Sequence, residues 1–164
     1  MHYEEFKSLY QKLNNDSDKE DFLQNYVDED MSKELANFLL DIGLNPKESD
    51  LSRNEAFKIL RIYIGDFDYS EIFKKIIHFF NNVNEDIYLR IEALSILKRA
   101  TITVNEAEFA MSILKKNENE LIDSAALQVL TFHRKLPFVK LLLRQLIEDK
   151  SAFAEDAQIA LDSD

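Results

Sequence analysis

The chain has 164 residues and no cysteine, which excludes disulfides, thiolate metal sites and cysteine nucleophiles. Its 31 acidic and 20 basic residues give a formal net charge of −11, which opposes binding to nucleic-acid phosphate and to an anionic membrane surface. Hydrophobic residues make up 46% of the chain while Gly and Pro number only 2 each, so we expect an all-α protein with few tight turns.

The first 30 residues predict a helical hairpin that caps the N-terminus. Apolar side chains at helical spacing run from Tyr3 to Leu13, and a polar stretch then interrupts the pattern. Ser17 and Glu20 have the spacing of a capping box, ahead of an apolar face that ends near Val27.

Eight further helices are predicted from apolar periodicity. Gly43 and Gly65 are expected to end two of them, since glycine readily adopts the left-handed conformation of a helix C-terminus. The only long irregular link is 45–51, so nothing separates two domains. The predicted helices cover residues 31–42, 52–64, 69–81, 84–100, 104–116, 118–133, 137–149 and 152–162.

Polar residues at the expected starts of these helices predict their N-caps. Ser52 with Glu55, and Thr103 with Glu106, have capping-box spacing. Asn84 is expected to cap the helix that follows it. Asp68 with Glu71 caps the helix at 69–81, and Pro137 suits a first turn because its missing amide donor costs nothing there.

A repeat organises the middle of the chain. Residues 84–97 recur in register as 117–130, an offset of 33 residues that places Ala93 on Ala126. Looser copies place Ala56 and Ala157 in the same position. A period of this length in a helical pattern is typical of helical-repeat arrays.

The repeated helix resembles the inner helix of HEAT-type repeats. The third copy has Asp123 where that pattern has Arg, and the upstream copy keeps Arg53 but has Ser52 in an apolar position. The best copy matches the pattern at Asn84, Leu89, Arg90, Ala93, Leu94 and Leu97. The resemblance implies a right-handed α-α superhelix (an α-solenoid) of about ten helices in five antiparallel pairs, whose second helices line a concave, partner-binding face. We expect one domain over 1–164, with central repeats at 31–134 and caps at 1–30 and 135–164.

Most side chains of the repeated helix are expected to pack in the core. The remaining narrow stripe of side chains is not needed for packing, and it defines the candidate partner-binding surface. The alternative is that helix rotation differs between copies, in which case Phe132 belongs to the core. Projected through the repeat, the stripe comprises Glu55, Lys58, Ile62, Tyr88, Glu92, Ser95, Arg99, Leu121, Gln128, Phe132 and Asp156, with Leu51, Ala125, Ala152, Ile159 and Ser163 in equivalent positions.

No motif indicates catalysis, a metal or a cofactor. The histidines at 2, 78 and 133 lack metal-ligand spacing, and there is no glycine-rich phosphate loop. Arg90 and Asp123 occupy equivalent positions in adjacent repeats, which predicts either an ion pair between repeats or a ligand contact for Arg90. We expect no catalytic residue, no metal and no cofactor.

The sequence therefore predicts a non-catalytic, cytoplasmic protein-binding module. Its acidity favours a basic protein partner and disfavours nucleic acid or membrane, although acidity also simply keeps a protein soluble. By analogy of size and charge, the chain has the character of bacterial immunity proteins that inhibit basic toxins. We expect a monomer or a one-to-one complex with the partner. The alternatives are an adaptor subunit of a larger assembly, and an enzyme or small-ligand carrier that uses groove carboxylates.

Overall fold

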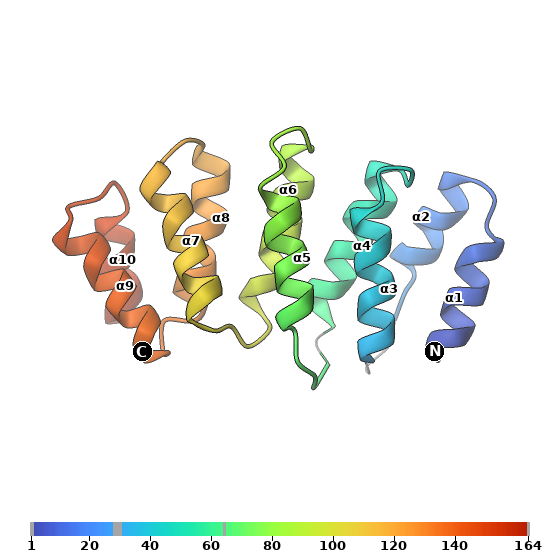
Figure 1. Ribbon diagram of the computed structural model, residues 1–164, viewed down its shortest axis with the longest axis horizontal. Helices are drawn as coiled ribbons and strands as arrows, with labels where there is room; N and C mark the ends of the chain where they lie inside the picture. Colours follow the sequence, from blue (N-terminus) through green and yellow to red (C-terminus); the bar gives the residue numbers. More distant parts are fainter. Residues whose placement is uncertain (1, 28–30, 64, 164) are drawn as a thin grey trace. The chain divides into compact units, whose positions relative to one another are not determined.

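The computed structural model describes residues 2–27, 31–63 and 65–163, and it is all-helical over that part of the chain (Figure 1). These residues form ten α-helices and one short 3-10 helix and no strand, which confirms the all-α prediction for them. None of these helices combines the length and the apolar character that crossing a membrane requires. In chain order the elements are α1 (Tyr3–Lys12), α2 (Asp16–Gln24), α3 (Lys33–Leu44), α4 (Asp50–Ile62), α5 (Ser70–Phe80), α6 (Ile87–Ser95), the 3-10 helix η1 (Ile96–Lys98), α7 (Val104–Lys116), α8 (Glu120–Phe132), α9 (Pro137–Glu148) and α10 (Ala154–Asp162).

The chain divides into two compact units, Met1–Ile96 and Leu97–Asp164. The division falls inside the segment 31–134 that the sequence assigns to the central repeats. The single domain and its caps at 1–30 and 135–164 stay a prediction.

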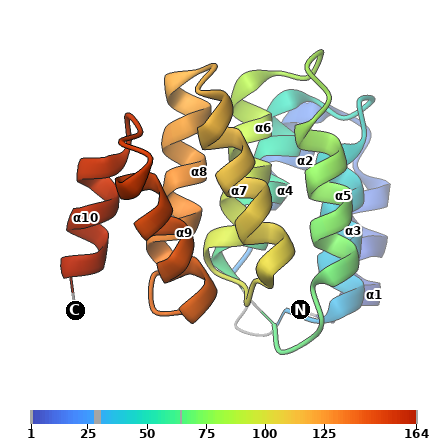
Figure 2. The same cartoon turned by 60° about the vertical axis from the view of Figure 1, so that its left-hand side comes forward.

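In the first unit, α3 packs on α4, α5 packs on α6, and both α2 and α6 contact α4 (Figures 1 and 2). The N-terminal hairpin is held by aromatic packing. The fully buried ring of Phe6 lies 4.9 Å from Phe22, 5.4 Å from Tyr26 and 6.2 Å from Phe38 of α3, between ring centroids. Such tilted and edge-on contacts add to the burial of apolar area.

A polar network ties the hairpin to the link before α4. The Tyr10 hydroxyl donates to Glu48 Oε2 at 3.1 Å, and Lys19 Nζ lies 2.8 Å from the same oxygen. Ser49 Oγ donates to Glu20 Oε1 at 2.8 Å. Burial, followed by the Glu48 carboxylate, raises the pKa of Tyr10. The side chains of Glu48 and Ser49 in the link at 45–49 therefore bind the link to the N-terminal hairpin.

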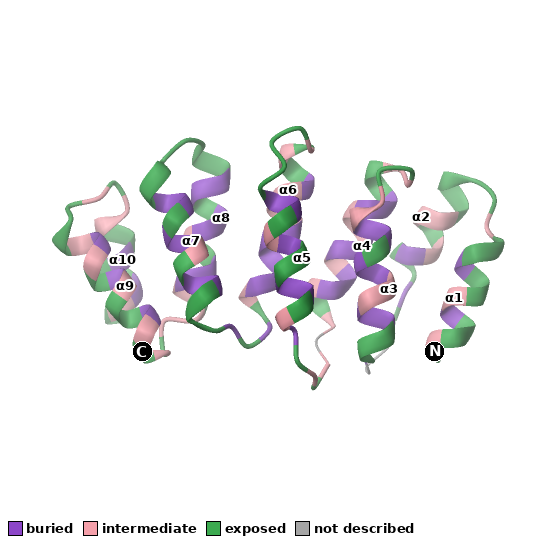
Figure 3. Ribbon diagram, viewed as in Figure 1, coloured by how far each residue is buried: buried purple, intermediate pink, exposed green. Residues whose placement is uncertain are grey.

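In the second unit, α7 packs on α8 and on α9, and α9 packs on α10 (Figure 2). His133 Nε2 donates to the backbone carbonyl of Leu97 at 2.7 Å. Each of these helices carries buried residues (Figure 3). This core is aliphatic and includes Ala107, Ala110, Leu114, Ala126, Val129, Leu130, Val139, Leu143 and Leu146.

Two predicted features of helix starts are confirmed in the second unit. Thr103 and Glu106 form the predicted capping box, in which Glu106 Oε2 accepts from the Thr103 amide at 2.7 Å. Pro137 is the first residue of α9.

Three predicted caps in the first unit are wrong by two or three residues. Asn15 rather than Ser17 caps α2, Ser49 rather than Ser52 caps α4, and Asp86 caps α6 in place of Asn84. Each segment holds several short polar residues, and the one whose oxygen reaches a first-turn amide is decided by how the preceding link folds. Asp68 was predicted to cap α5 together with Glu71, but it lies two residues before the helix. Its carboxylate accepts a hydrogen bond from the Ser70 amide instead.

The expected role of Gly43 is also wrong. Gly43 lies inside α3, and its φ is not positive. A Cβ at this position would overlap the ring of Phe57 on α4. Glycine is needed here because α3 and α4 approach closely. Likewise α4 ends at Ile62 before Gly65, and the predicted end at Ile64 lies outside the described residues.

Two arginines in the same repeat position, Arg53 and Arg90, make equivalent hydrogen bonds in the first unit. Arg53 Nε donates to the carbonyl of Gly43 at 3.0 Å, and Arg90 Nε donates to the carbonyl of Phe80 at 2.7 Å, ten residues back in each case. Each guanidinium therefore satisfies an orphan carbonyl at the end of the preceding helix, where a positive charge is favoured. This geometry supports the register in which the repeat aligns Arg53 with Arg90.

Candidate functional site

The negative charge is unevenly divided between the two units. Residues 1–96 contain 20 acidic and 11 basic residues, a formal net charge of −9, whereas residues 97–164 contain 11 and 9, a net charge of −2. Long-range attraction of a basic partner would thus act mainly on the first unit.

The charged candidate residues of the first unit are paired within the protein. Glu55 Oε1 lies 2.7 Å from Lys58 Nζ on the same helix. Glu92 Oε2 on α6 lies 3.6 Å from Arg61 Nε on α4. These two carboxylates are partly buried and largely neutralised, so they contribute little to the attraction of a cation.

The remaining candidates in the first unit divide by exposure. Ile62 and Tyr88 are exposed, as predicted. Ser95, which was expected on the same stripe, is only 5% exposed. Ser95 still lies inside α6, so its angle on the helix is as projected, and its burial shows that the fold covers this part of the stripe.

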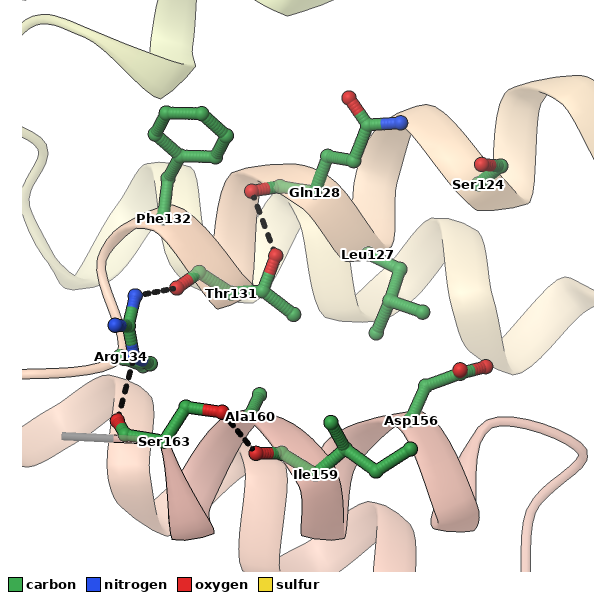
Figure 4. A pocket seen from close by; sticks show the side chains of 10 residues that line it. All are labelled: Ser124, Leu127, Gln128, Thr131, Phe132, Arg134, Asp156, Ile159, Ala160 and Ser163. Atoms are coloured by element: carbon green, nitrogen blue, oxygen red, sulfur yellow. Dashed lines mark hydrogen bonds between the residues drawn. The ribbon is translucent and has the colours of Figure 1, made fainter.

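The second unit contains a groove between α8 and α10, with a volume of about 420 Å³ (Figure 4). Its apolar walls are Leu127 and Phe132 on α8 and Ile159 and Ala160 on α10. Phe132 is 57% and Ile159 58% exposed, so the groove is open to solvent. Its complete lining is Ser124, Leu127, Gln128, Thr131, Phe132, Arg134, Asp156, Ile159, Ala160 and Ser163.

The groove exists because small side chains fail to fill it. Leu127 occupies the repeat position of Leu94, which is fully buried in the first unit, yet Leu127 remains partly exposed. Ala160 and Ser124 are the neighbours in the groove, and neither is large enough to cover it.

Four of the six polar side chains that line the groove bond within the protein. Thr131 and Ser163 each donate a hydroxyl to a carbonyl of their own helix, at 3.2 Å and 2.7 Å. The Gln128 side-chain oxygen accepts from Lys98 Nζ at 2.9 Å. Arg134 donates to the carbonyls of Ser163 at 3.0 Å and Thr131 at 3.3 Å, which joins the ends of α8 and α10.

Among bonds between described residues, none involves the other two groove side chains, Ser124 and Asp156. Asp156 is exposed in the first turn of α10. Figure 4 shows its carboxylate at one end of the groove and Arg134 at the other. The groove thus offers an apolar floor and one free carboxylate.

The chain matched no family model, no curated protein and no solved structure in the three comparisons made.

The structure brings five of the predicted stripe residues together: Gln128, Phe132, Asp156, Ile159 and Ser163 all line the groove. Phe132 is exposed, so the alternative that it belongs to the core is wrong. Arg99 and Leu121 are exposed but do not line the groove. Whether any of these residues binds a partner stays a prediction.

Sequence reasoning missed the role of Lys98, Thr131 and Arg134 at the groove. Lys98 Nζ lies 5.6 Å from the centre of the Phe132 ring and donates a hydrogen bond to the Gln128 side chain. It therefore contacts two residues that line the groove. Arg134 directly follows the end of α8, and a cation at that place is a recognisable signal of helix C-terminal capping. Nothing in the sequence indicates its second partner on α10.

Asp123 is a buried polar residue outside the groove. It is 2% exposed, and its Oδ1 has no hydrogen-bond partner. Burial raises the pKa of Asp123, opposed in part by a backbone hydrogen bond from Asn119. The predicted ion pair between Asp123 and Arg90 would connect the two units and stays a prediction.

Acidic and histidine side chains do not gather into a metal site in the described part of the chain. Among those residues no group of three or more His, Cys, Asp or Glu is placed to hold a metal ion.

Proposed function

We propose that this chain is a non-catalytic protein-binding module built as a HEAT-like α-solenoid. In this proposal five antiparallel helix pairs wind into a right-handed superhelix, and the second helices α4, α6, α8 and α10 carry the binding residues. The matching bonds of Arg53 and Arg90 support a true structural repeat.

The observation that carries the proposal is the exposed apolar groove between α8 and α10. Leaving apolar side chains such as Phe132 and Ile159 in water costs about 25 cal/mol per Å² relative to covering them. Exposed apolar area bordered by polar groups is typical of contact surfaces. Most of the groove's polar groups bond within the protein, which favours a docking surface over a reaction site.

The charge distribution supports a basic protein as the partner. The net charge of −9 on the first unit would speed encounter with a cationic protein and slow approach to nucleic acid or an anionic membrane. Within this proposal the chain is cytoplasmic and forms a one-to-one complex, and its role is that of an immunity-type inhibitor of a basic toxin. An adaptor subunit in a larger assembly is the other binding role.

An enzyme or small-ligand carrier would need free carboxylates on the candidate surface. The ion pairs of Glu55 with Lys58 and of Glu92 with Arg61 reduce their availability. These contacts favour the binding interpretation.

The test is reconstitution with a captured partner. The tagged chain is used to capture proteins from its own cells, and each basic candidate is purified and mixed with it. We expect a one-to-one complex by light scattering. Its association rate should fall at least about tenfold when salt rises from about 0.1 M to about 1 M, because the Debye length shortens from about 10 Å to about 3 Å. An inhibitor should also abolish the partner's activity at one equivalent. The proposal fails if no purified basic protein forms such a complex, or if association is insensitive to salt.

A further inference from the structure

We propose that the groove between α8 and α10 receives an amphipathic helix of the partner, which inserts two apolar side chains and places a basic side chain on Asp156. This inference rests on the proposed function, and it specifies which element of the partner is bound and by what chemistry.

The size of the groove fits two side chains from one face of a helix. A cavity of about 150 Å³ holds one benzene ring, so about 420 Å³ accommodates two or three side-chain ends. From Asp156 to Ser163 the α10 wall rises by roughly 10 Å, which is two helical turns. Anchors at positions i and i+4 of a docked helix are about 6 Å apart and fall within that length.

The hydrogen bonds already made by the groove's polar groups favour a helix over an extended peptide as the ligand. An extended segment brings one unpaired amide and one unpaired carbonyl per residue, and these must be satisfied when buried. The groove walls are helices whose backbones are bonded internally, and four of the six polar side chains are already engaged. A helix satisfies its own backbone and needs only apolar contact along most of its length.

The charges of the groove indicate where a basic residue would lie. The guanidinium of Arg134 is bonded to two helix-end carbonyls, whereas the carboxylate of Asp156 is exposed and forms no ion pair within the described residues. A Lys or Arg about one turn from the apolar anchors of the partner helix would form an ion pair with Asp156. The groove is open to solvent beside Phe132 and Ile159, whereas sites for small molecules bury most of the ligand.

The experiment uses the full-length protein and a displayed library of amphipathic helices as the probe. Binders are selected on the wild-type chain and then tested by titration against variants. Phe132→Ser with Ile159→Ser removes both exposed walls, and Asp156→Asn removes the charge. Leu141→Ser is the matched control, since Leu141 on α9 is 63% exposed and does not line the groove.

We expect selected helices to carry paired apolar residues at i and i+4 and a nearby Lys or Arg. The double Ser variant should lower their affinity at least about tenfold, and Asp156→Asn about threefold at low salt, with Leu141→Ser unchanged. Four results would overturn the inference: helices bind the double Ser variant as well as the wild type, no helix is enriched, a proline-rich extended library is enriched instead, or the free protein is a dimer dissociated by the double Ser variant.

The inference and the proposed function can fail separately. If the captured basic partner binds the double Ser variant with unchanged affinity, the function stands and the groove is not its site. If no basic partner forms a salt-sensitive complex, the function fails whatever the library shows.

Discussion

Arg53 offers the sharpest test of how the first unit is held together. Its side chain is 4% exposed and joins three elements. Besides its bond to the Gly43 carbonyl at the end of α3, Nη2 lies 2.8 Å from Glu85 Oε2 in the link before α6. The guanidinium also lies 5.5 Å from the centre of the Phe79 ring. Replacement by methionine keeps an unbranched apolar side chain and removes every polar contact.

The expected loss for Arg53→Met is about 3–5 kcal/mol, because one partner of a largely buried ion pair is removed and the Glu85 carboxylate stays behind. For a chain of this size that corresponds to a fall in Tm of roughly 6–20 °C. The contact with Asp50 at 3.3 Å adds little, since that carboxylate is well exposed.

Tyrosine fluorescence during urea unfolding is a selective assay, because all six tyrosines lie in residues 1–96 and the chain has no tryptophan. Arg144→Met makes the same chemical change at an exposed site on α9 and should alter stability by less than about 0.5 kcal/mol. Adding Glu85→Gln to Arg53→Met should recover about 1–3 kcal/mol, since the unpaired charge is gone. A loss below about 1 kcal/mol for Arg53→Met, or strict additivity with Glu85→Gln, would refute the reasoning.

Three further variants test other features. Gly43→Ala should lower the free energy of unfolding by about 1–3 kcal/mol in urea titrations, because the new methyl group overlaps the ring of Phe57; a more stable variant would contradict the close approach of α3 and α4. Asp123→Asn should raise Tm at pH 7 by an amount equivalent to about 1 kcal/mol. The folded-state pKa of Asp123 is raised, so ionisation destabilises the fold as pH rises through that pKa, and the gain should vanish below about pH 4; an equal gain at both pH values would exclude a charge effect. Thr103→Ala should cost about 1 kcal/mol and speed amide hydrogen exchange in the first turn of α7; unchanged exchange there would show that the capping box does not hold that turn.

The sequence predicted local structure well wherever a helix start or end depends on residues close together in the chain. Helical periodicity located all ten α-helices of the described chain, with ends within about three residues except at α6, which ends at Ser95 rather than at Ala100. The capping box at Thr103 was predictable because donor and acceptor lie three residues apart on one turn. The cap of α4 was not, because Ser49 and Ser52 both have a suitable oxygen and the path of the preceding link selects between them.

The candidate surface was predictable only where no other part of the fold covers the projected face. The repeat alignment placed Gln128 and Phe132 on one face of α8 and Asp156 on the corresponding face of α10, and the structure gathers these faces at one groove. The same projection failed at Ser95 and Ala125, which both lie inside α-helices and are both only 5% exposed. The pattern gives the angle of a side chain on its own helix but does not show whether another part of the fold covers it.

By itself the sequence determined the helical class, the repeat register and the acidic charge, since each follows from composition or from spacing along one chain. Only the tertiary structure decided which groups meet. Gly43 is required by a neighbouring ring rather than by its own φ, and Arg53 finds a partner 32 residues away. The groove between α8 and α10 is a volume that small side chains on two helices leave unfilled. Such contacts depend on distances between elements, which periodicity within one element does not encode.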